Sequence, residues 1–274
     1  MRIASIAAFA FVVSLLAAPV GAASRAELQS LREVIGIEPL LEIIREEGLE
    51  HSEALQEDLF SGRGGQSWFA VVSRIHDLSK MEARFSAEFD AAMQGVDVAP
   101  LMAFFTSDTG REIVSLELEG RNALMRPGAE DAAREAFARL ERDAPDRVVL
   151  LREFVEINDL VELNVTGAMN ASLAFMRGLS EGEGFEMSEA DILADIWARE
   201  AEIREETTGW VFAYLGMAYQ PLEADQIRAY SELSRSVEGQ ALNRALFAGF
   251  DAMFNDISFA LGQTASRFMV GEDL

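Results

Sequence analysis

The 274-residue sequence contains no cysteine. This absence excludes disulfides, thiolate metal sites and thiol nucleophiles. It also excludes a lipoprotein, whose acyl chains are attached to a cysteine at the cleavage site. A chain without disulfides has to fold on its apolar core alone, and a chain of this length with 50% hydrophobic residues is able to do so.

Basic residues are few. Lysine and arginine together number 23 against 47 aspartates and glutamates, which gives a formal net charge of −24 at pH 7. A negative field of this size argues against nucleic acid and against anionic lipid headgroups as partners. A basic protein or a cation remains compatible with it.

Recognisable catalytic groups are also scarce. The sequence has two histidines, His51 and His76, and neither belongs to a Glu-x-x-His or His-Glu-x-x-His pattern. Gly-x-Ser-x-Gly and the phosphate-binding glycine patterns are absent. Carboxylate pairs such as Glu153 and Glu156 are expected to be a charged solvent face. The sequence therefore predicts no catalytic residue, no cofactor and no metal site, and the protein is not expected to be an enzyme.

The first residues have the pattern of a secretory signal peptide. Arg2 is followed by an uncharged, apolar run that ends in the small residues Gly21, Ala22 and Ala23. We expect residues 1–22 to be the signal peptide, cut after Ala22 or Ala23, and no stable membrane span to remain. The alternative is an uncleaved anchor, because about 20 apolar residues are long enough to cross a bilayer.

The rest of the chain has the periodicity of helices. Glycine and proline are rare inside the periodic segments, and no useful length alternates as a strand does, so the predicted class is all-α. We expect residues 23–274 to form a single domain, a multi-helix bundle. A break at Asp143-Ala144-Pro145 divides it into halves of about 24–142 and 145–274.

Individual segments carry more specific predictions. Long helices are expected over 68–93 and 148–176, with a loop over 178–184. The charged segment 130–142 is expected to be an exposed connector. Residues 210–219 are apolar on every side, which predicts a buried helix or the wall of an apolar site.

The two halves show weak internal similarity. A shift of 129 positions superposes a Ser/Thr-Gly turn and its following helix on a second copy, pairing Ser107 with Ser236 and Gly110 with Gly239. We expect each serine to cap a helix and each glycine to allow a close helix crossing. A duplication is the favoured explanation, and independent helical hairpins are the alternative.

The first copy of this turn also carries a family resemblance. The segment Phe104-Phe105-Thr106-Ser107-Asp108-Thr109-Gly110-Arg111 resembles the central motif of exported bacterial helical proteins that form the domain of unknown function 2059 family. The second copy departs from the motif by carrying Gln240 in place of Arg111. The resemblance implies an all-helical fold and a periplasmic or envelope location, and it supplies no catalytic residues.

Two functions fit these observations. The favoured one is a non-catalytic protein-interaction module that binds another envelope protein through an apolar groove between the halves. The alternative is a carrier of a lipid or other small apolar ligand, for which an enclosed apolar space near Trp210 and the last helix would be decisive. The candidate apolar binding surface comprises Trp210, Phe212, Tyr214, Met217, Phe250 and Phe254.

Overall fold

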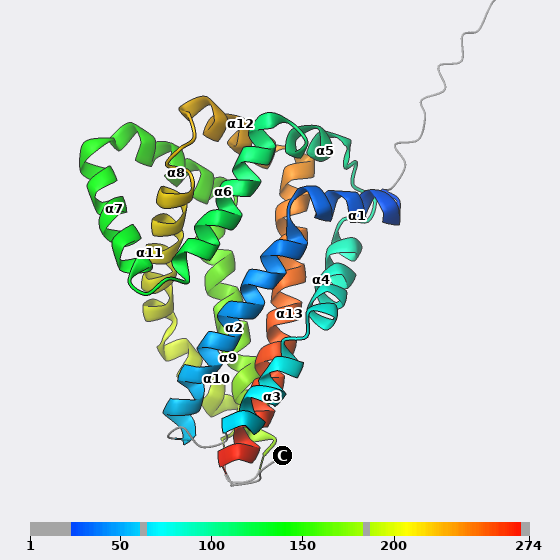
Figure 1. The fold of residues 1–274 in the computed structure, drawn as a ribbon, viewed down its shortest axis with the longest axis vertical. Helices are drawn as coiled ribbons and strands as arrows, with labels where there is room; N and C mark the ends of the chain where they lie inside the picture. Colours follow the sequence, from blue (N-terminus) through cyan, green and yellow to red (C-terminus); the bar gives the residue numbers. More distant parts are fainter. Residues whose placement is uncertain (1–22, 61–64, 183–186, 270–274) are drawn as a thin grey trace, which may run out of the picture.

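The computed structural model describes residues 23–60, 65–182 and 187–269 (Figure 1). The predicted signal peptide, 1–22, lies outside the described residues. Within the described residues the chain forms helices joined by short turns and contains no strand, so the all-α prediction is confirmed.

The helices follow one another closely along the chain. The first are α1 (Arg25–Val34), α2 (Ile37–Phe60), α3 (Gly65–Ile75), α4 (Leu78–Ala92), α5 (Ala99–Phe105) and α6 (Asp108–Leu124). They are followed by α7 (Ala129–Asp143), α8 (Pro145–Ile157), α9 (Leu160–Ser180) and α10 (Glu189–Ala198). The last three are α11 (Glu200–Ala218), α12 (Ala224–Arg235) and α13 (Val237–Met269).

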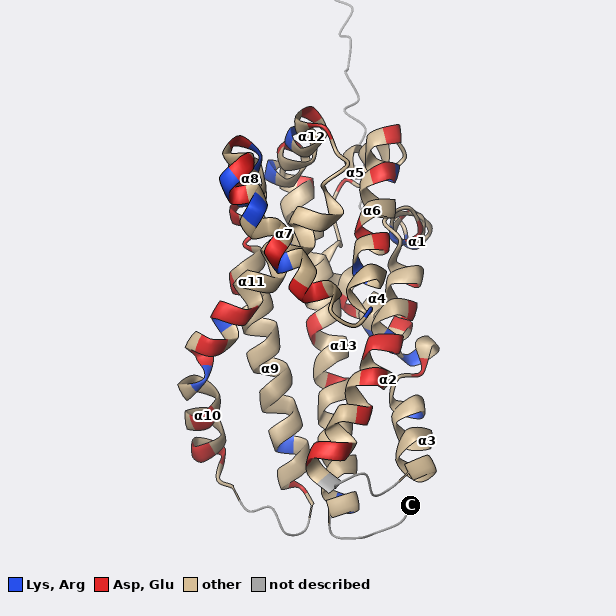
Figure 2. Cartoon of the chain, turned by 60° about the vertical axis from the view of Figure 1, so that its left-hand side comes forward, with Lys and Arg blue, Asp and Glu red and all other residues tan. Residues whose placement is uncertain are grey.

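Helix α13 is the axis of the fold. It has 33 residues and runs nearly the full height of the molecule in Figure 1, with α3 and α4 on one side and α9 beside it. Figure 2 shows that α9 is almost free of charged residues, whereas α7, α8 and α11 carry many. Acidic residues therefore lie mainly on the outer helices, around an apolar centre.

Helices α9 and α13 cross backbone to backbone. A Cβ on Gly178 would lie 2.2 Å from the carbonyl oxygen of Phe259, and a Cβ on Gly262 would lie 2.1 Å from the carbonyl oxygen of Phe175. Neither separation is possible for real atoms, so only glycine fits at these two positions. The crossing brings the two central helices as close as their main chains permit.

Two apolar clusters make up the core. The first joins α1 to α5 with α13 and contains the fully buried Trp68, Phe85 and Phe89. The second joins α6, α8, α11 and α12 around Leu151 and the side chain of Tyr219. Because α13 completes the core of the N-terminal helices, the two sequence halves are interleaved.

Both long helices expected from periodicity are interrupted, and those predictions are wrong. The segment 68–93 breaks at His76, because the side chain of Asp77 accepts a 3.1 Å hydrogen bond from the N–H of Lys80 and caps a new helix. The segment 148–176 breaks at Asn158 and Asp159, where Asp159 adopts a φ of 51°.

Two further predictions are corrected. The loop expected over 178–184 begins later, because α9 continues to Ser180 and Gly178 forms the helix crossing; residues 183–186 lie outside the described residues. The charged segment 130–142 is more than a connector. It forms most of α7, which packs along α11 and stacks Phe137 on Phe212 with ring centroids 5.2 Å apart.

The predicted serine caps are present at both turns. Ser107 Oγ accepts the N–H of Gly110 at 3.1 Å, and its hydroxyl donates to the carbonyl of Phe104 at 2.6 Å. Ser236 Oγ accepts the N–H of Gly239 at 2.9 Å and donates to the carbonyl of Leu233 at 2.7 Å. The two turns thus have the same hydrogen-bond arrangement at positions 129 residues apart in the sequence.

The glycines of the two turns are equivalent as well. A Cβ on Gly110 would lie 2.1 Å from the carbonyl oxygen of Phe104, and a Cβ on Gly239 would lie 2.0 Å from that of Leu233. Arg111 bonds the carbonyl of Thr106 across the first turn, and Gln240 bonds that of Ser234 across the second at 2.7 Å. The equivalence covers the turns, and duplication of the whole halves stays a prediction.

Candidate binding site

A cavity of about 460 Å³ lies among α2, α6, α8, α9, α11, α12 and α13. This volume falls in the range of roughly 300–1,000 Å³ that is typical of small-molecule sites. Its lining is predominantly apolar and is contributed by both halves of the chain. The apolar residues of the lining include Leu40, Ile44, Leu163, Leu246, Phe250 and Phe254.

Small residues on α9 form part of the cavity wall. Ala171 lies four residues after Gly167 and three after Ala168, so it shares a side of the helix with both. A Cβ on Gly167 would lie 2.8 Å from Oδ1 of Asp251, so α13 is close at this point. The short side chains leave space where α9 would otherwise fill the interior.

The predicted apolar surface is only partly gathered at the cavity. Tyr214, Phe250 and Phe254 line it. Trp210 lies behind Tyr214, with the two rings stacked at 5.2 Å and an interplanar angle of 9°. Phe212 faces α7 instead, and Met217 is not part of the lining.

Glu117 is the residue of the cavity that sequence reasoning missed. Its carboxyl Oε1 accepts a 2.5 Å hydrogen bond from the hydroxyl of Tyr219, and its main-chain carbonyl accepts one of 2.9 Å from the hydroxyl of Tyr214. Burial raises the pKa of Glu117 to about 7, and the bond from Tyr219 opposes that rise. The carboxyl therefore changes its protonation near neutral pH.

A sequence signal for Glu117 did exist. Ile113 and Gly120 are buried, and Glu117 lies four residues after the first and three before the second, on the same face of α6. An acidic residue within a buried helical stripe is unusual enough to be a candidate site. It was hidden by the abundance of other acidic residues on the helices.

Three phenols surround the carboxyl. Tyr214, Tyr219 and Tyr230 all line the cavity, and burial raises the pKa of each above its ordinary value. The phenols consequently remain protonated at neutral pH. Tyr219 and Tyr214 use their O–H groups on Glu117, while Tyr230 stacks on Phe104 with ring centroids 5.5 Å apart.

The cation at the cavity wall, Arg121, is already paired. Its guanidinium donates to both carboxylate oxygens of Glu47, at 2.6 and 2.5 Å, and lies over the ring of Trp210 at 5.0 Å from the centroid. The two side chains are 26% and 27% exposed. A bidentate pair of this kind neutralises the charge of Arg121.

Three asparagines add hydrogen-bond acceptors to the lining. Asn158, Asn164 and Asn243 each donate an amide N–H to a main-chain carbonyl, at 2.9, 2.7 and 2.9 Å. Within the part of the chain that the structure describes, nothing donates to their amide oxygens. Asp251, whose pKa burial raises, also lines the cavity. Each amide also keeps a second N–H, so the polar part of the lining offers both acceptors and donors, together with the carboxyls of Glu117 and Asp251.

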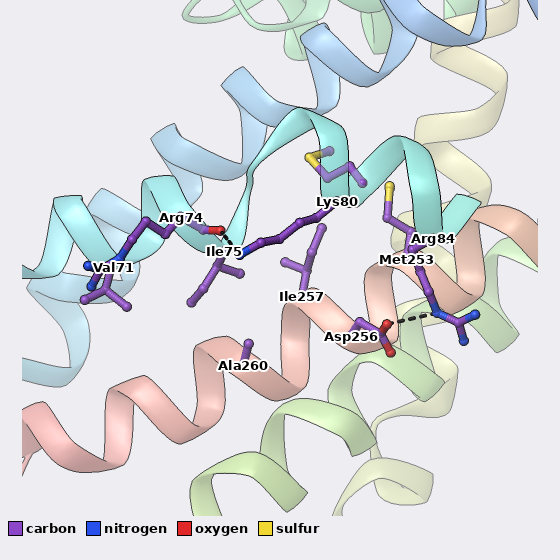
Figure 3. Close-up of a pocket in the computed structure, with 10 residues that line it drawn as sticks. Val71, Arg74, Ile75, Lys80, Arg84, Met253, Asp256, Ile257 and Ala260 are labelled. Atoms are coloured by element: carbon purple, nitrogen blue, oxygen red, sulfur yellow. Dashed lines mark hydrogen bonds and ion pairs between the residues drawn. The ribbon is translucent and has the colours of Figure 1, made fainter. Parts of the chain in front are cut away.

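A second pocket lies between α3, α4 and α13, with a volume of about 420 Å³ (Figure 3). Two of its three basic side chains are engaged locally: the ammonium of Lys80 donates to the main-chain carbonyl of Arg74 at 3.3 Å, and Arg84 pairs with Asp256 at 2.9 Å. This pocket has a mixed lining and lacks a buried unpaired group, so it is the weaker candidate.

Neither histidine lies at a cavity with other ligands. His51 is exposed, and His76 is buried with its Nδ1 bonded to the carbonyl of Val72 at 3.0 Å. Burial lowers the pKa of His76, so its ring is neutral at neutral pH. Among residues 23–60, 65–182 and 187–269, no three His, Asp or Glu side chains are placed to hold a metal ion.

Among the helices that the structure describes, none is both long enough and apolar enough to cross a membrane. Comparisons with models of protein families, with curated proteins and with solved structures found no match. The resemblance to the domain of unknown function 2059 family therefore stays a prediction that depends on the motif around Ser107.

Proposed function

We propose that this protein is a carrier that binds a small apolar ligand in the interhelical cavity. The observation that supports the proposal is the cavity itself, about 460 Å³ with a mainly apolar lining. Pockets between α2 and α3 and between α1 and α5 have similar volumes, about 530 and 470 Å³, so size alone does not single this cavity out. Its distinction is a mainly apolar lining that seven helices from both halves of the chain contribute, which is typical of a ligand site.

The proposal includes export and a periplasmic location. The pattern of Arg2 followed by an apolar run and small residues supports a cleaved leader over 1–22. Apolar molecules need a carrier to cross an aqueous compartment, because their transfer into water is unfavourable. We further propose that the domain arose as two related halves, which the equivalent turns at Ser107 and Ser236 support.

Binding of the neutral apolar dye Nile red tests the proposal. The wild-type protein should bind about one dye per chain in equilibrium dialysis. Ala171→Phe should weaken binding about tenfold or more, because the new ring occupies the cavity beside α9. Ala201→Phe, at an exposed position of α11, is the matched control and should bind as the wild type does.

Native mass spectrometry of the protein purified from its own host supplies an independent readout. A carrier should retain a small apolar molecule, and Ala171→Phe should not. Equal dye binding by the wild type and Ala171→Phe, together with an empty protein from the host, would contradict the proposal.

The second candidate is the protein-interaction role that the sequence favours. One observation supports it: Trp197 is 66% exposed and Leu193, one helical turn earlier on α10, is 37% exposed. An exposed apolar pair on an outer helix is typical of a contact surface. Crosslinking in the native envelope should then recover a partner with the wild type and not with Trp197→Ser, and failure to recover one would count against this role.

A further inference from the structure

We infer that the ligand carries an amine head group, bound as an ammonium by Glu117, and that apolar molecules with a carboxylate head are rejected. This inference rests on the proposed carrier function and specifies its ligand class. It is derived from the charges and hydrogen-bond partners around the cavity.

The charged groups at the cavity do not balance. Glu117 and Asp251 contribute two carboxyls from different helices, α6 and α13. Arg121 contributes a positive charge, but its two hydrogen bonds to Glu47 already neutralise it. The lining therefore has carboxyls without a matching cation, and an ammonium group on the ligand would supply the missing charge.

Glu117 also has unused hydrogen-bonding capacity. A carboxylate can accept about four hydrogen bonds. Oε1 accepts one from Tyr219, and Oε2 accepts none from the described residues. Glu117 is half-buried and lines the cavity, so Oε2 is open there to water or to a polar group of a ligand. An ammonium provides three N–H donors, which suits this position.

The asparagines do not select between head groups. Each donates one amide N–H to a main-chain carbonyl, and its second N–H and its amide oxygen remain for the cavity. A carboxylate head group would be repelled by the carboxyls of Glu117 and Asp251. Arg121 keeps its Nη1 donors, but its pair with Glu47 already offsets its charge, so it compensates this repulsion only in part.

The protonation of Glu117 links binding to pH. The titratable and charged groups that face it or share the cavity are Glu47 on α2, Arg121 on α6, Tyr214 and Tyr219 from α11, Tyr230 on α12 and Asp251 on α13. Helices α8 and α9 contribute uncharged side chains there. A bound ammonium favours the ionised carboxyl, so amine binding should tighten and release a proton as pH rises through the pKa of Glu117, about 7.

Competition for bound Nile red among dodecylamine, dodecanol and dodecanoate tests the inference, because the three share one alkyl chain. At about pH 8 the wild type should prefer dodecylamine to dodecanol by about tenfold and bind dodecanoate most weakly, as expected for one charge-assisted hydrogen bond. Glu117→Gln should reduce the amine preference to less than about threefold. Asp251→Asn should reduce it partially, and Glu119→Gln, at an exposed position of α6, should leave it unchanged.

Salt and pH distinguish binding of dodecylamine in the cavity from its attraction to the acidic surface. Attraction of dodecylamine to surface carboxylates is screened by added salt, whereas the preference due to Glu117 should persist at about 0.5 M salt. In the wild type the preference should fall as pH is lowered from about 8 to about 5.5, and this measurement does not depend on the folding of any variant.

The possible outcomes distinguish failure of the head-group inference from failure of the carrier function. If dodecanol and Nile red bind but dodecanoate binds as well as dodecylamine, or if the amine preference survives in Glu117→Gln, the head-group inference is overturned and the carrier function stands. If neither Nile red nor any of the three amphiphiles binds, the carrier function itself fails.

Discussion

Tyr219 donates a 2.5 Å hydrogen bond to Oε1 of Glu117, although the two residues are 102 positions apart and come from different halves of the chain. Burial favours the neutral carboxyl, and this bond favours the ionised one. The balance brings the pKa of Glu117 to about 7, where either protonation state is accessible.

The cost of ionising Glu117 should be measurable in the free energy of unfolding. Its pKa rises from 4.5 to about 7 on folding, so the folded protein binds the extra proton between those pH values and loses stability as pH rises through them. This loss in the free energy of unfolding amounts to about 3 kcal/mol. Urea denaturation should therefore show that Glu117→Gln gains stability relative to wild type by about this amount between about pH 4 and pH 8.

Glu119→Gln is the matched control for that experiment, because Glu119 is exposed on the same helix and its carboxylate accepts a hydrogen bond from Ser115. Its stability relative to wild type should be nearly constant over the same pH range. A difference curve for Glu117→Gln that is equally flat would show that the carboxyl ionises normally in the folded protein.

Removal of single phenol hydroxyls should show how much each of the two hydrogen bonds at Glu117 contributes to stability. Tyr219→Phe removes a donor to the carboxylate and should cost about 2 kcal/mol at about pH 8, and less at about pH 5, where the carboxyl is protonated. Tyr214→Phe removes a bond to the main-chain carbonyl and should cost about 1 kcal/mol at both pH values. Chemical denaturation measures both, and equal pH dependence in the two variants would contradict the assignment.

The glycine crossing of α9 and α13 should tolerate no side chain. Gly178→Ala and Gly262→Ala each place a Cβ against a main-chain carbonyl that cannot move without separating the helices. Each should lower the free energy of unfolding by about 3 kcal/mol. Thermal and urea unfolding give this value directly.

Gly209→Ala is the control for the crossing. Gly209 is also helical, but the atoms nearest to its added Cβ belong to the guanidinium of Arg134, which is the flexible end of a side chain. This substitution should be neutral or stabilising by up to about 1 kcal/mol, because alanine is the better helix former. A similar loss in all three variants would indicate that the helices do not cross at Gly178 and Gly262.

The two serine caps should be energetically equivalent. Ser107→Ala and Ser236→Ala remove the same pair of hydrogen bonds, and each should cost about 1 kcal/mol. Ser115→Ala, which removes an exposed contact with Glu119 within α6, should cost less than about 0.5 kcal/mol. Markedly unequal losses at the two caps would argue against a shared origin of the turns.

Local features of the fold were predictable from the sequence because they depend on neighbouring residues. The caps at Ser107 and Ser236 each need only a hydroxyl and an N–H three residues later. The apolar end of α11 was recognisable because residues 210–219 contain no charge. Helical periodicity sufficed for the all-α class.

Features that depend on distant residues were not predictable. The break at Asn158 is supported by Asn243, which donates to its carbonyl at 2.9 Å from another helix. The role of Glu117 depends on Tyr219, and the cavity depends on how seven helices pack. Only three of the six predicted surface residues reached the cavity, because the two faces of α11 pack against different neighbours.

The positions of the three tryptophans have a practical consequence. Trp68 is 1% exposed in the core, Trp197 is 66% exposed on α10, and Trp210 stacks on a cavity-lining tyrosine beneath the guanidinium of Arg121. Indole emission reports polarity and nearby charge, so the core, the surface and the cavity wall each contain their own optical probe. A protein that retains only Trp210 would register occupancy of the cavity without any attached label.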